Sequence, residues 1–421
     1  MKATIFPSTC SGTVKIPPSK SMSHRAIIAA SLADGKSTIS NLAFSEDITT
    51  TIEGMKNLGA KITCFDDSIE VEGIKDFKHL KDPTVFCKES GSTLRFFIPI
   101  FSLCNQTIAF TGENRLLKRP QKIYEDIFKS QNIPYIQDDE KIEIGGSLKS
   151  GNYELDGNVS SQFISGLLFA LPLLSEDSTI HIKEPYESRS YVDLTLEILE
   201  LFGIEATYSD SNTLFIKGGQ AYKANDYTVE GDFSQTGFFA VLASISNDLT
   251  LTGLNPQSKQ GDKQIIDIIK DFGIEVKENA DGYSIKKGEL TPGKIDLQDC
   301  PDLGPILTVL MAYTKGESEI YNAIRLRYKE SDRIAAMETE LKKCGVEIHS
   351  TEGEIKVVGN PPYECNEELS GHKDHRIVMS LAVAATLFKQ PVTINEAHFI
   401  NKSYPTFFED LASVGIEVNY E

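Results

Sequence analysis

The 421-residue sequence lacks several common signals. Its seven cysteines form no C-x-x-C pair and no cluster with histidine, so we expect neither a disulfide framework nor a structural zinc site. The longest apolar stretches, Phe96–Leu103 and Leu167–Leu174, are far too short to span a bilayer. Met1–Phe6 leads into Pro7 and polar residues rather than an apolar segment, so no signal peptide is expected. We therefore expect a cytoplasmic protein with reduced cysteines.

Positive charge is also scarce. Lysine and arginine total 42 residues against 61 aspartates and glutamates, which gives a net charge of −19. Such a balance disfavours nonspecific binding to nucleic acids or membranes. The basic residues nevertheless gather beside serine, glycine and histidine at particular places in the chain. This pattern indicates a small anionic ligand held in a focused site.

A short phrase recurs six times along the chain, about 71 residues apart, which is typical of a repeat architecture. In each copy an amphipathic helix precedes a residue suited to a left-handed helix cap. An alternating strand, a polar turn and a second strand follow, so each repeat contains a helix, a cap and a β-hairpin. The predicted caps are Gly59, Asn132, Gly203, Gly273, Gly345 and Gly415.

The sixth copy reaches Glu421 before its second hairpin strand, so we expect residues 3–16 to supply strands at that end. Three copies in each half predict two similar domains of ordinary size. The first lobe is expected to span residues 19–229. The second is expected to be discontinuous, with residues 1–18 and 230–421, and to be closed by the N-terminal strand.

Several polar motifs stand at or just before the start of a predicted helix. Each by itself is more often an N-cap or a solvated loop, but equivalent helix ends in a repeat architecture point the same way. We therefore expect the motifs to share an anion-binding cleft between the domains, where helix N-termini favour phosphate. The glycines of a nucleotide-binding P-loop are absent. The motifs are 17–25, 89–95, 112–120, 160–162, 325–333, 374–376 and 401–405.

At these motifs the chain resembles the enolpyruvyl transferases, in particular the branch that acts on shikimate-3-phosphate. The resemblance covers the whole length and implies an α/β (α+β) fold. In that fold, two similar domains, each of three βαβαββ repeats, form a pseudo-sixfold inside-out barrel. It implies transfer of the enolpyruvyl group of phosphoenolpyruvate to the 5-hydroxyl of shikimate-3-phosphate, with release of phosphate, in the pathway to chorismate and the aromatic amino acids. No cofactor or metal and no partner beyond these substrates is implied, and we expect a monomer.

The resemblance also implies site residues. Catalytic roles fall to Lys20, Asp302 and Glu330, with the assignment of acid and base left open. Shikimate-3-phosphate is expected to contact Lys20, Ser21, Arg25, Ser160, Ser161, Gln162, Ser188, Tyr191, Asp302 and Lys329. Phosphoenolpyruvate is expected to contact Lys20, Gly91, Arg95, Arg119, Gln162, Arg333, His375, Arg376 and Lys402. The chain departs from the family at Glu89, where many relatives carry asparagine.

Three alternatives stay open at this point. An enolpyruvyl transferase acting on UDP-N-acetylglucosamine typically carries a reactive cysteine in the loop matching Gly112–Pro120, where this chain has none. An RNA 3′-phosphate cyclase needs a nucleophilic histidine and a nucleotide site. A non-enzymatic repeat scaffold predicts evenly spread basic residues, whereas Lys329–Arg333 has no copy in the other repeats.

Overall fold

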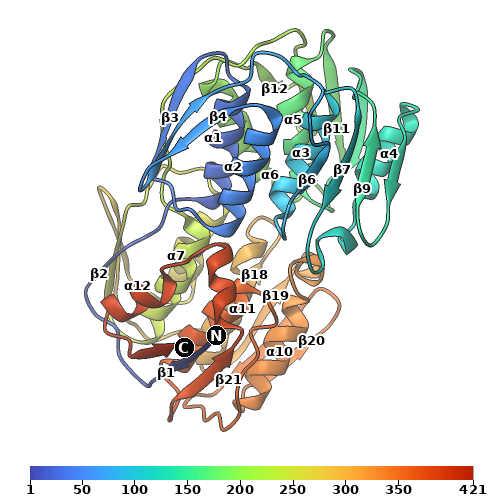
Figure 1. Cartoon of the computed structure of the whole chain (residues 1–421). Coiled ribbons are helices and arrows are strands. Elements are labelled where there is room, and N and C mark those ends of the chain that lie inside the picture. The colour runs from blue at the N-terminus through green and yellow to red at the C-terminus, as the bar shows by residue number, and fades with distance from the viewer. Residues whose placement is uncertain (421) are drawn as a thin grey trace. The chain divides into compact units, whose positions relative to one another are not determined.

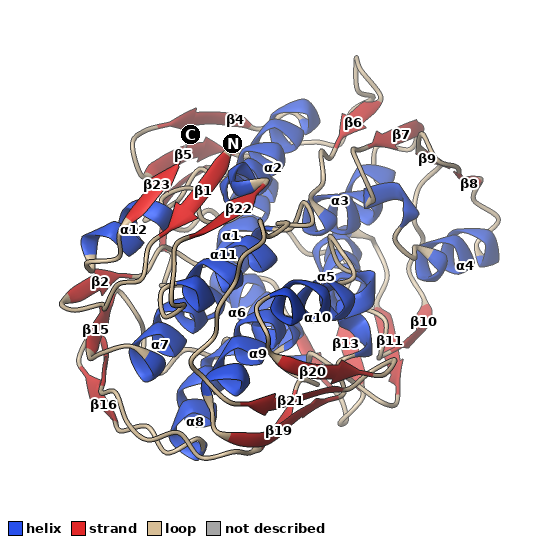
Figure 2. Ribbon diagram, turned by 90° about the horizontal axis from the view of Figure 1, so that it is seen from below, coloured by secondary structure: helices blue, strands red, loops and turns tan. Residues whose placement is uncertain are grey.

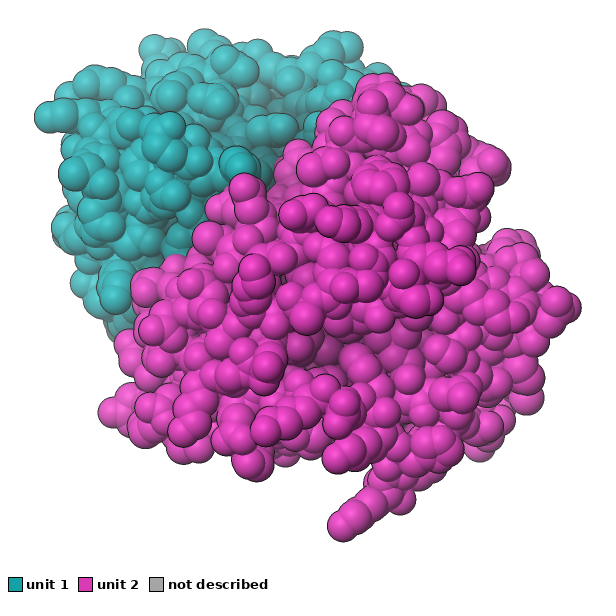
Figure 3. Space-filling view, turned by 90° about the horizontal axis from the view of Figure 1, so that it is seen from above, with its two compact units in different colours: residues 1–19, 230–421 teal, residues 20–229 magenta. Residues whose placement is uncertain are grey.

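The computed structural model describes residues 1–420. The chain forms two compact units, which Figure 3 shows in different colours. Unit 2 is the continuous segment Lys20–Val229, and unit 1 combines Met1–Ser19 with the chain from Glu230 onward. The two segments of unit 1 meet where the chain passes between the units, because Ser19 N donates to Glu230 O at 2.7 Å. Each unit is described by itself below.

The elements of both units follow one order of strands and helices, which Figure 1 labels along the chain. Those of unit 2 are α1 (Lys20–Leu32), β3 (Lys36–Ser40), α2 (Glu46–Leu58), β4 (Lys61–Cys64), β5 (Ser68–Glu72), β6 (Thr84–Phe86), α3 (Gly91–Ser102), β7 (Thr107–Thr111), η1 (Leu116–Lys118), α4 (Lys122–Ser130), β8 (Tyr135–Gln137), β9 (Ile142–Gly145), β10 (Asn152–Asp156), α5 (Ser161–Ala170), η2 (Leu171–Leu173), β11 (Ser178–Lys183), α6 (Arg189–Leu201), β12 (Ala206–Tyr208), β13 (Thr213–Ile216) and β14 (Tyr227–Thr228). Those of unit 1 are β1 (Lys2–Ile5), β2 (Thr13–Lys15), α7 (Phe233–Ile245), β15 (Leu249–Thr252), η3 (Gly261–Lys263), α8 (Gln264–Asp271), β16 (Val276–Asn279), β17 (Gly282–Ile285), β18 (Lys294–Asp296), η4 (Pro301–Leu303), α9 (Gly304–Tyr313), β19 (Gly316–Tyr321), η5 (Ile324–Tyr328), α10 (Arg333–Lys343), β20 (Glu347–Ser350), β21 (Ile355–Gly359), α11 (His375–Ala385), β22 (Val392–Asn395), η6 (Ala397–Lys402), α12 (Phe407–Ser413) and β23 (Val418–Tyr420).

The predicted repeat is confirmed by the strand pairing. In the sheet β10-β11-β13-β12, the first two strands are parallel and joined through α5, whereas the other pairs are antiparallel. The sheets β6-β7-β9-β8 and β18-β19-β21-β20 repeat this pattern, with α3 and α9 between their parallel strands. The sheets β14-β3-β5-β4 and β2-β15-β17-β16 have the same strand directions, but their parallel strands β14 and β2 come from distant segments of the chain. Each repeat is therefore a βαβαββ unit, in which the hairpin is formed by its last two strands.

The helix caps also follow the predicted pattern. All six cap residues adopt the left-handed backbone conformation, which glycine enters without steric cost and asparagine tolerates. Because the hairpin strand begins within a few residues, this cap turns the chain from the amphipathic helix into the sheet. The φ angles are 117° at Gly59, 58° at Asn132, 77° at Gly203, 93° at Gly273, 82° at Gly345 and 94° at Gly415.

Two kinds of helix build each unit. All residues of α7 and α11 are buried, as are all of α9 except its last, and the three helices contact one another. Such helices are apolar on every side, which is typical of a helix in the interior of a protein. By contrast, α8 buries only Ile265, Ile266 and Ile269 and exposes its other face. Figure 2 shows β15 beside α7, and β19 and β21 beside α9, in agreement with their contacts. Nowhere in residues 1–420 is a helix long and apolar enough to cross a membrane.

The first strand of the chain completes the last repeat. β1 lies between β22 and β23 and is antiparallel to both, so that Ala3 pairs with Ile394 on one side and with Tyr420 on the other. Its position corresponds to the second hairpin strand of the other repeats. Ala3 and Ile5 are fully buried, whereas Lys2 is exposed and pairs with Glu368. The strand thus joins the two ends of the chain in one sheet.

We expect Ile5→Ala to lower the free energy of unfolding of unit 1 by about 2 to 4 kcal/mol, because it leaves a cavity at a fully buried position. The matched control Lys2→Ala removes only an exposed ion pair on the same strand and is expected to change it by less than about 0.5 kcal/mol. Urea unfolding followed by hydrogen exchange resolved for each unit measures both. Equal effects of the two variants would show that β1 is not part of the core.

Candidate functional site

A buried arginine holds together the polar cluster of unit 1. Asp332 caps α10 by accepting from the N–H of Ala335, which places Arg333 at the first position of that helix. Its guanidinium donates from Nε to Asp374 Oδ2 at 2.8 Å and from Nη2 to Asp374 Oδ1 at 3.2 Å. It also donates to Glu330 Oε2 at 2.8 Å and to Asp302 Oδ1 at 3.1 Å. Arg333 therefore sets the relative positions of three carboxylates.

Asp302 is a carboxylate that contacts three cations, Lys329, Arg333 and Arg376. It lies in η4, just before α9, and accepts from Lys329 Nζ at 3.2 Å. Arg376 Nη2 donates to Asp302 Oδ2 at 3.2 Å and to Ser234 Oγ at 2.9 Å. Arg376 thus links the starts of α7, α9 and α11.

The charges in this cluster determine its protonation states. Burial alone would raise the pKa of Asp302, but Arg376, Lys329 and Arg333 together lower it well below its usual range. Burial also opposes ionisation of Asp374, yet Arg333 lowers the pKa of that carboxyl to about 2. Burial lowers the pKa of Lys329, against the opposing effect of Asp302. Asp302 is therefore ionised at neutral pH and suited to accept a hydrogen bond from a hydroxyl group.

Two further predicted residues lie in the same cluster. Lys402, at the end of η6, is 2% exposed, and its Nζ lies 3.6 Å from Glu330 Oε1. His375 is 1% exposed, and its Nδ1 lies 3.8 Å from Asp374 Oδ1. Arg333 and Arg376, at helix starts, and Lys402 thus bring several cations into this cluster, and cations of this kind suit a phosphate or carboxylate ligand.

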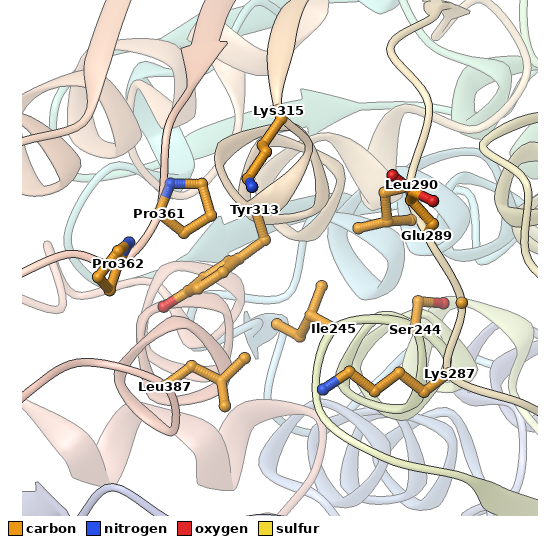
Figure 4. A pocket seen from close by; sticks show the side chains of 11 residues that line it. Ser244, Ile245, Lys287, Glu289, Leu290, Tyr313, Lys315, Pro361, Pro362 and Leu387 are labelled. Atoms are coloured by element: carbon orange, nitrogen blue, oxygen red, sulfur yellow. The ribbon is translucent and has the colours of Figure 1, made fainter.

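The buried helices α7, α9 and α11 of unit 1 start near this cluster, and their C-terminal ends lie near one another on the side away from it. At their far ends, Tyr313 Oη donates to Ala384 O at 2.6 Å, which joins the end of α9 to that of α11. A pocket of about 390 Å³ opens at these far ends, and Figure 4 shows its side chains. It contains none of the residues predicted from the sequence, so it is separate from the cluster. Its lining is Ser244, Ile245, Lys287, Gly288, Glu289, Leu290, Tyr313, Lys315, Pro361, Pro362 and Leu387.

In unit 2, a second polar cluster forms where α3 and α5 begin. Ser160 caps α5, because its Oγ accepts from the N–H of Gln162. Arg95 donates from Nη1 to Gln162 Oε1 at 2.9 Å and to Ser160 Oγ at 3.3 Å, and it stacks over the Phe163 ring. Gln162 Nε2 donates in turn to Ser92 Oγ at 2.8 Å. The two helix starts are therefore linked by side chains that remain close to solvent.

Gly91 allows the closest approach in this second cluster. It is the first residue of α3, and a Cβ built on it would lie 2.8 Å from Arg119 Nη1 and 3.7 Å from Gln162 Oε1. Only glycine leaves this space without moving the arginine. Arg119 is 9% exposed and follows η1. Two arginines, an amide and the start of α3 thus lie around one point, which suits a compact anion.

Lys20 begins α1, and its Nζ lies 2.9 Å from Asp47 Oδ2 in the first turn of α2. Both side chains are mostly buried. An ion pair of this kind orients the ammonium group, so that Lys20 is held at the start of its helix rather than free in solvent. Asp47 was not among the residues predicted from the sequence, although its place in a first helical turn beside Ser45 is a recognisable signal.

Arg25 lies deeper in unit 2 than the sequence suggested. It is 2% exposed and donates to the backbone carbonyls of Ser21 at 2.8 Å and Tyr191 at 2.9 Å. Its Nε donates to Thr195 Oγ1 at 2.8 Å. Burial lowers the pKa of Arg25 to about 10. Arg25 therefore connects the start of α1 to the start of α6, and Ser188 stands directly before α6 with φ 53°.

The predicted site residues divide between the two units. Those of unit 2 are Lys20, Ser21, Arg25, Gly91, Arg95, Arg119, Ser160, Ser161, Gln162, Ser188 and Tyr191. Those of unit 1 are Asp302, Lys329, Glu330, Arg333, His375, Arg376 and Lys402. Sequence reasoning missed the roles of Asp374, Ser234 and Thr195, which contact the predicted arginines. In residues 1–420 no group of three potential ligands is arranged to hold a metal ion.

Comparisons with known proteins agree on one family. The model of the family described as EPSP synthase (3-phosphoshikimate 1-carboxyvinyltransferase) matches residues 6–411. A 3-phosphoshikimate 1-carboxyvinyltransferase of Clostridium perfringens is 45% identical over 98% of both chains. Its counterpart in Clostridium kluyveri is 44% identical over 99% of this chain and 98% of its own.

Solved structures show the same fold. EPSP synthase from Acinetobacter baumannii is 26% identical and covers 100% of both chains with a TM-score of 0.80. The enolpyruvyl transferase NikO from Streptomyces tendae, at 16% identity, covers 100% of this chain and 98% of its own with the same TM-score. The predicted enolpyruvyl transferase fold is therefore confirmed.

The Arg333–Asp374 pair predicts a loss of stability in acid. Since the folded state lowers the pKa of Asp374 to about 2, its stabilisation is complete above the unfolded pKa of about 4. It is lost as the pH falls from about 4 through 2, and amounts to about 2 to 3 kcal/mol. Asp374→Asn is expected to remove this pH dependence and to destabilise unit 1 by a similar amount at pH 7.

Urea unfolding between pH 2 and pH 7 measures this effect. The matched control is Asp126→Asn, which removes an exposed carboxylate paired with Lys122 and is expected to change stability by less than about 0.5 kcal/mol. An Asp374→Asn variant as stable as the wild type at every pH would contradict the assigned ion pair.

Proposed function

The chain belongs to the EPSP synthase family, and we propose on that basis that it transfers the enolpyruvyl group of phosphoenolpyruvate to the 5-hydroxyl of shikimate-3-phosphate. The products are 5-enolpyruvylshikimate-3-phosphate and phosphate, in the shikimate pathway to chorismate and the aromatic amino acids. The observation that carries the proposal is Asp302, a carboxylate kept ionised among Lys329, Arg333 and Arg376. A substrate hydroxyl needs such an acceptor, and a phosphorylated co-substrate needs such cations.

The chemistry requires two proton movements. In the addition step, the 5-oxygen forms a bond to C2 of phosphoenolpyruvate, the hydroxyl loses its proton, and the methylene carbon gains one. In the elimination step, the resulting tetrahedral ketal loses a proton from the new methyl group, and its bond to phosphate breaks. We assign acceptance of the hydroxyl proton to Asp302, because the surrounding cations keep it ionised and unprotonated at neutral pH.

The transfer of protons at the methylene carbon is assigned to Glu330, assisted by Lys20. Glu330 lies between Arg333 and Lys402. The fixed positive charges of these two residues are suited to stabilise the negative charge that develops on the substrate during addition and elimination. Lys20 is oriented by Asp47 and begins a helix, so that it is suited to contact phosphate groups of both substrates. The chain's own residues thus supply both the proton acceptor and the electrostatic stabilisation.

The two clusters suggest a division between the substrates. We propose that shikimate-3-phosphate is bound mainly by unit 2, through Lys20, Ser21, Arg25, Ser160, Ser161, Gln162, Ser188 and Tyr191, with Asp302 and Lys329 contributed by unit 1. We propose that phosphoenolpyruvate is bound by Lys20, Gly91, Arg95, Arg119 and Gln162 of unit 2 and by Arg333, His375, Arg376 and Lys402 of unit 1. We propose further that the enzyme acts as a monomer in the cytoplasm.

Phosphate release from phosphoenolpyruvate tests the function directly. We expect release with shikimate-3-phosphate as acceptor and none with UDP-N-acetylglucosamine, with the product identified by its mass. Release with UDP-N-acetylglucosamine alone would support enolpyruvyl transfer but contradict the assignment of shikimate-3-phosphate as the acceptor. Release with neither acceptor would contradict the proposed function.

Substitutions test the catalytic assignments. Lys20→Ala and Glu330→Ala are each expected to lower kcat by roughly 10² to 10⁴, the range typical of general acid–base groups. The melting temperature is expected to change by only a few degrees in Glu330→Ala, because Arg333 keeps its contacts with Asp374 and Asp302. It is expected to fall somewhat further in Lys20→Ala, because that variant removes the ion pair with Asp47. Lys342→Ala, which removes an exposed ion pair on α10, serves as the control with unchanged kcat. A large fall in melting temperature with little change in kcat would identify structural rather than catalytic residues.

A further inference from the structure

A buried chain of hydrogen bonds crosses three helices of unit 2 without using any residue of the proposed site. His24 Nδ1 lies 2.7 Å from Thr51 Oγ1, which lies 2.7 Å from Thr93 Oγ1, and Thr93 donates to Ser90 Oγ at 2.7 Å. The four residues are at most 1% exposed. They connect α1 to α2 and α2 to α3, which are neighbours in Figure 1. A polar chain so deep in an apolar core is costly unless it is fully satisfied.

The hydrogen bonds of this chain all have the same donor-to-acceptor direction, from His24 toward Ser90. Each hydroxyl carries a single proton, and that of Thr93 is donated to Ser90. Thr93 must therefore accept from Thr51, and Thr51 must accept from His24. The His24 ring consequently carries its proton on Nδ1, and Nε2, which is buried without a hydrogen-bond partner, carries none.

The surroundings of His24 keep it neutral. Burial lowers the pKa of His24 to about 3; the Asp47 carboxylate opposes this shift, and the positive charges of Lys20 and Arg25 add to it. Its ring also meets the edge of the Phe96 ring at a centroid distance of 6.5 Å. A neutral ring with its proton on Nδ1 is the form that the chain of hydroxyl groups requires.

This chain ends at the turn that places Gly91. Ser90 caps α3, and its Oγ accepts both from the N–H of Thr93 at 3.2 Å and from the hydroxyl of Thr93. At the other end, Lys20 and His24 are one helical turn apart on α1, as Asp47 and Thr51 are on α2. Two contacts therefore join α1 to α2. One is the ion pair between Lys20 and Asp47, and the other is the hydrogen bond between His24 and Thr51, which continues through Thr93 to the start of α3.

We propose that His24 is a positioning residue, whose Nδ1–H holds the Ser90–Gly91 turn at a fixed distance from Lys20 and thereby determines the affinity for phosphoenolpyruvate. The inference rests on the proposed function. Gly91 lies close to the cations of the anion site, because a Cβ built on it would lie 2.8 Å from Arg119 Nη1. A shift of this turn therefore changes the position of Gly91. Among the shikimate-3-phosphate contacts, Ser160, Ser161, Gln162, Ser188 and Tyr191 belong to α5 and α6 or their caps, and Arg25 on α1 is held by Tyr191 and Thr195 of α6.

Steady-state kinetics of variants that keep the shape of the core test this role. Thr93→Val and His24→Leu are expected to lower kcat/KM for phosphoenolpyruvate about 10- to 100-fold, as expected for a misplaced binding group. The KM for shikimate-3-phosphate is expected to change less than about twofold. His24→Asn retains an amide N–H near the position of Nδ1 and is expected to recover most of the activity.

The control is Thr50→Val, one residue from Thr51 on α2, whose hydroxyl donates only to the carbonyl of Glu46. It is expected to leave both KM values unchanged. In the double variant His24→Leu/Thr93→Val, the loss is expected to match that of the more damaging single variant, because both break one chain. Losses that multiply, or equal rises in KM for both substrates, would overturn the proposal.

A measurement without substrates separates this inference from the proposed function. Nitrogen NMR of the His24 ring in the wild-type protein is expected to show a neutral ring protonated on Nδ1 from pH 5 to pH 9. Protonation on Nε2, or titration near pH 6.5, would contradict the hydrogen-bond direction whatever reaction the enzyme catalyses. A wild-type enzyme that shows the expected ring state but turns over neither acceptor would contradict the proposed function and, with it, the role in phosphoenolpyruvate affinity.

Discussion

Helices that are apolar on every side must be enclosed, and this constraint shapes unit 1. α7, α9 and α11 leave almost no residue exposed, so they contact one another and are covered by sheets and by amphipathic helices. Because equivalent helices run in the same direction, their starts meet at Asp302, Arg376 and Ser234. Polar groups that an apolar core excludes can then collect at the helix starts. The repeat thus creates a place for charged chemistry as a consequence of burying its helices.

The charges at that place are balanced within the protein. Arg333 is shared by Asp374, Glu330 and Asp302, and each carboxylate is satisfied by at least one cation. A buried cluster of this kind contributes little net stability, since desolvation offsets the attraction between the charges. It does fix the geometry of the side chains before a substrate arrives. Fixed donors and cations stabilise a transition state without the cost of reorganising solvent, which is the main electrostatic contribution to catalysis.

The two clusters differ in the groups that surround their cations. In unit 1 the arginines contact carboxylates, whereas in unit 2 Arg95 and Arg25 donate to hydroxyl, amide and carbonyl oxygens. Neutral acceptors leave more of the positive charge available to a ligand. This difference supports the assignment of anion-binding contacts for both substrates to unit 2 and of proton transfer to the carboxylates of unit 1. His24 and its chain of hydroxyls belong to the same design, since they position the start of α3 without adding charge.

The sequence by itself determined the architecture and the residue types of the site. The caps at Gly59 to Gly415 follow from a local conformational preference, and the spacing between them is visible in one dimension. The motifs at the helix starts were visible for the same reason. Only the tertiary structure decided which partners these residues have, such as Asp374 for Arg333, Asp47 for Lys20 and Thr195 for Arg25. These pairs are 27 to 170 residues apart, and no local preference specifies them. The burial that lowers the pKa of His24 and the opposing charges that lower that of Asp302 likewise arise only when distant segments pack together.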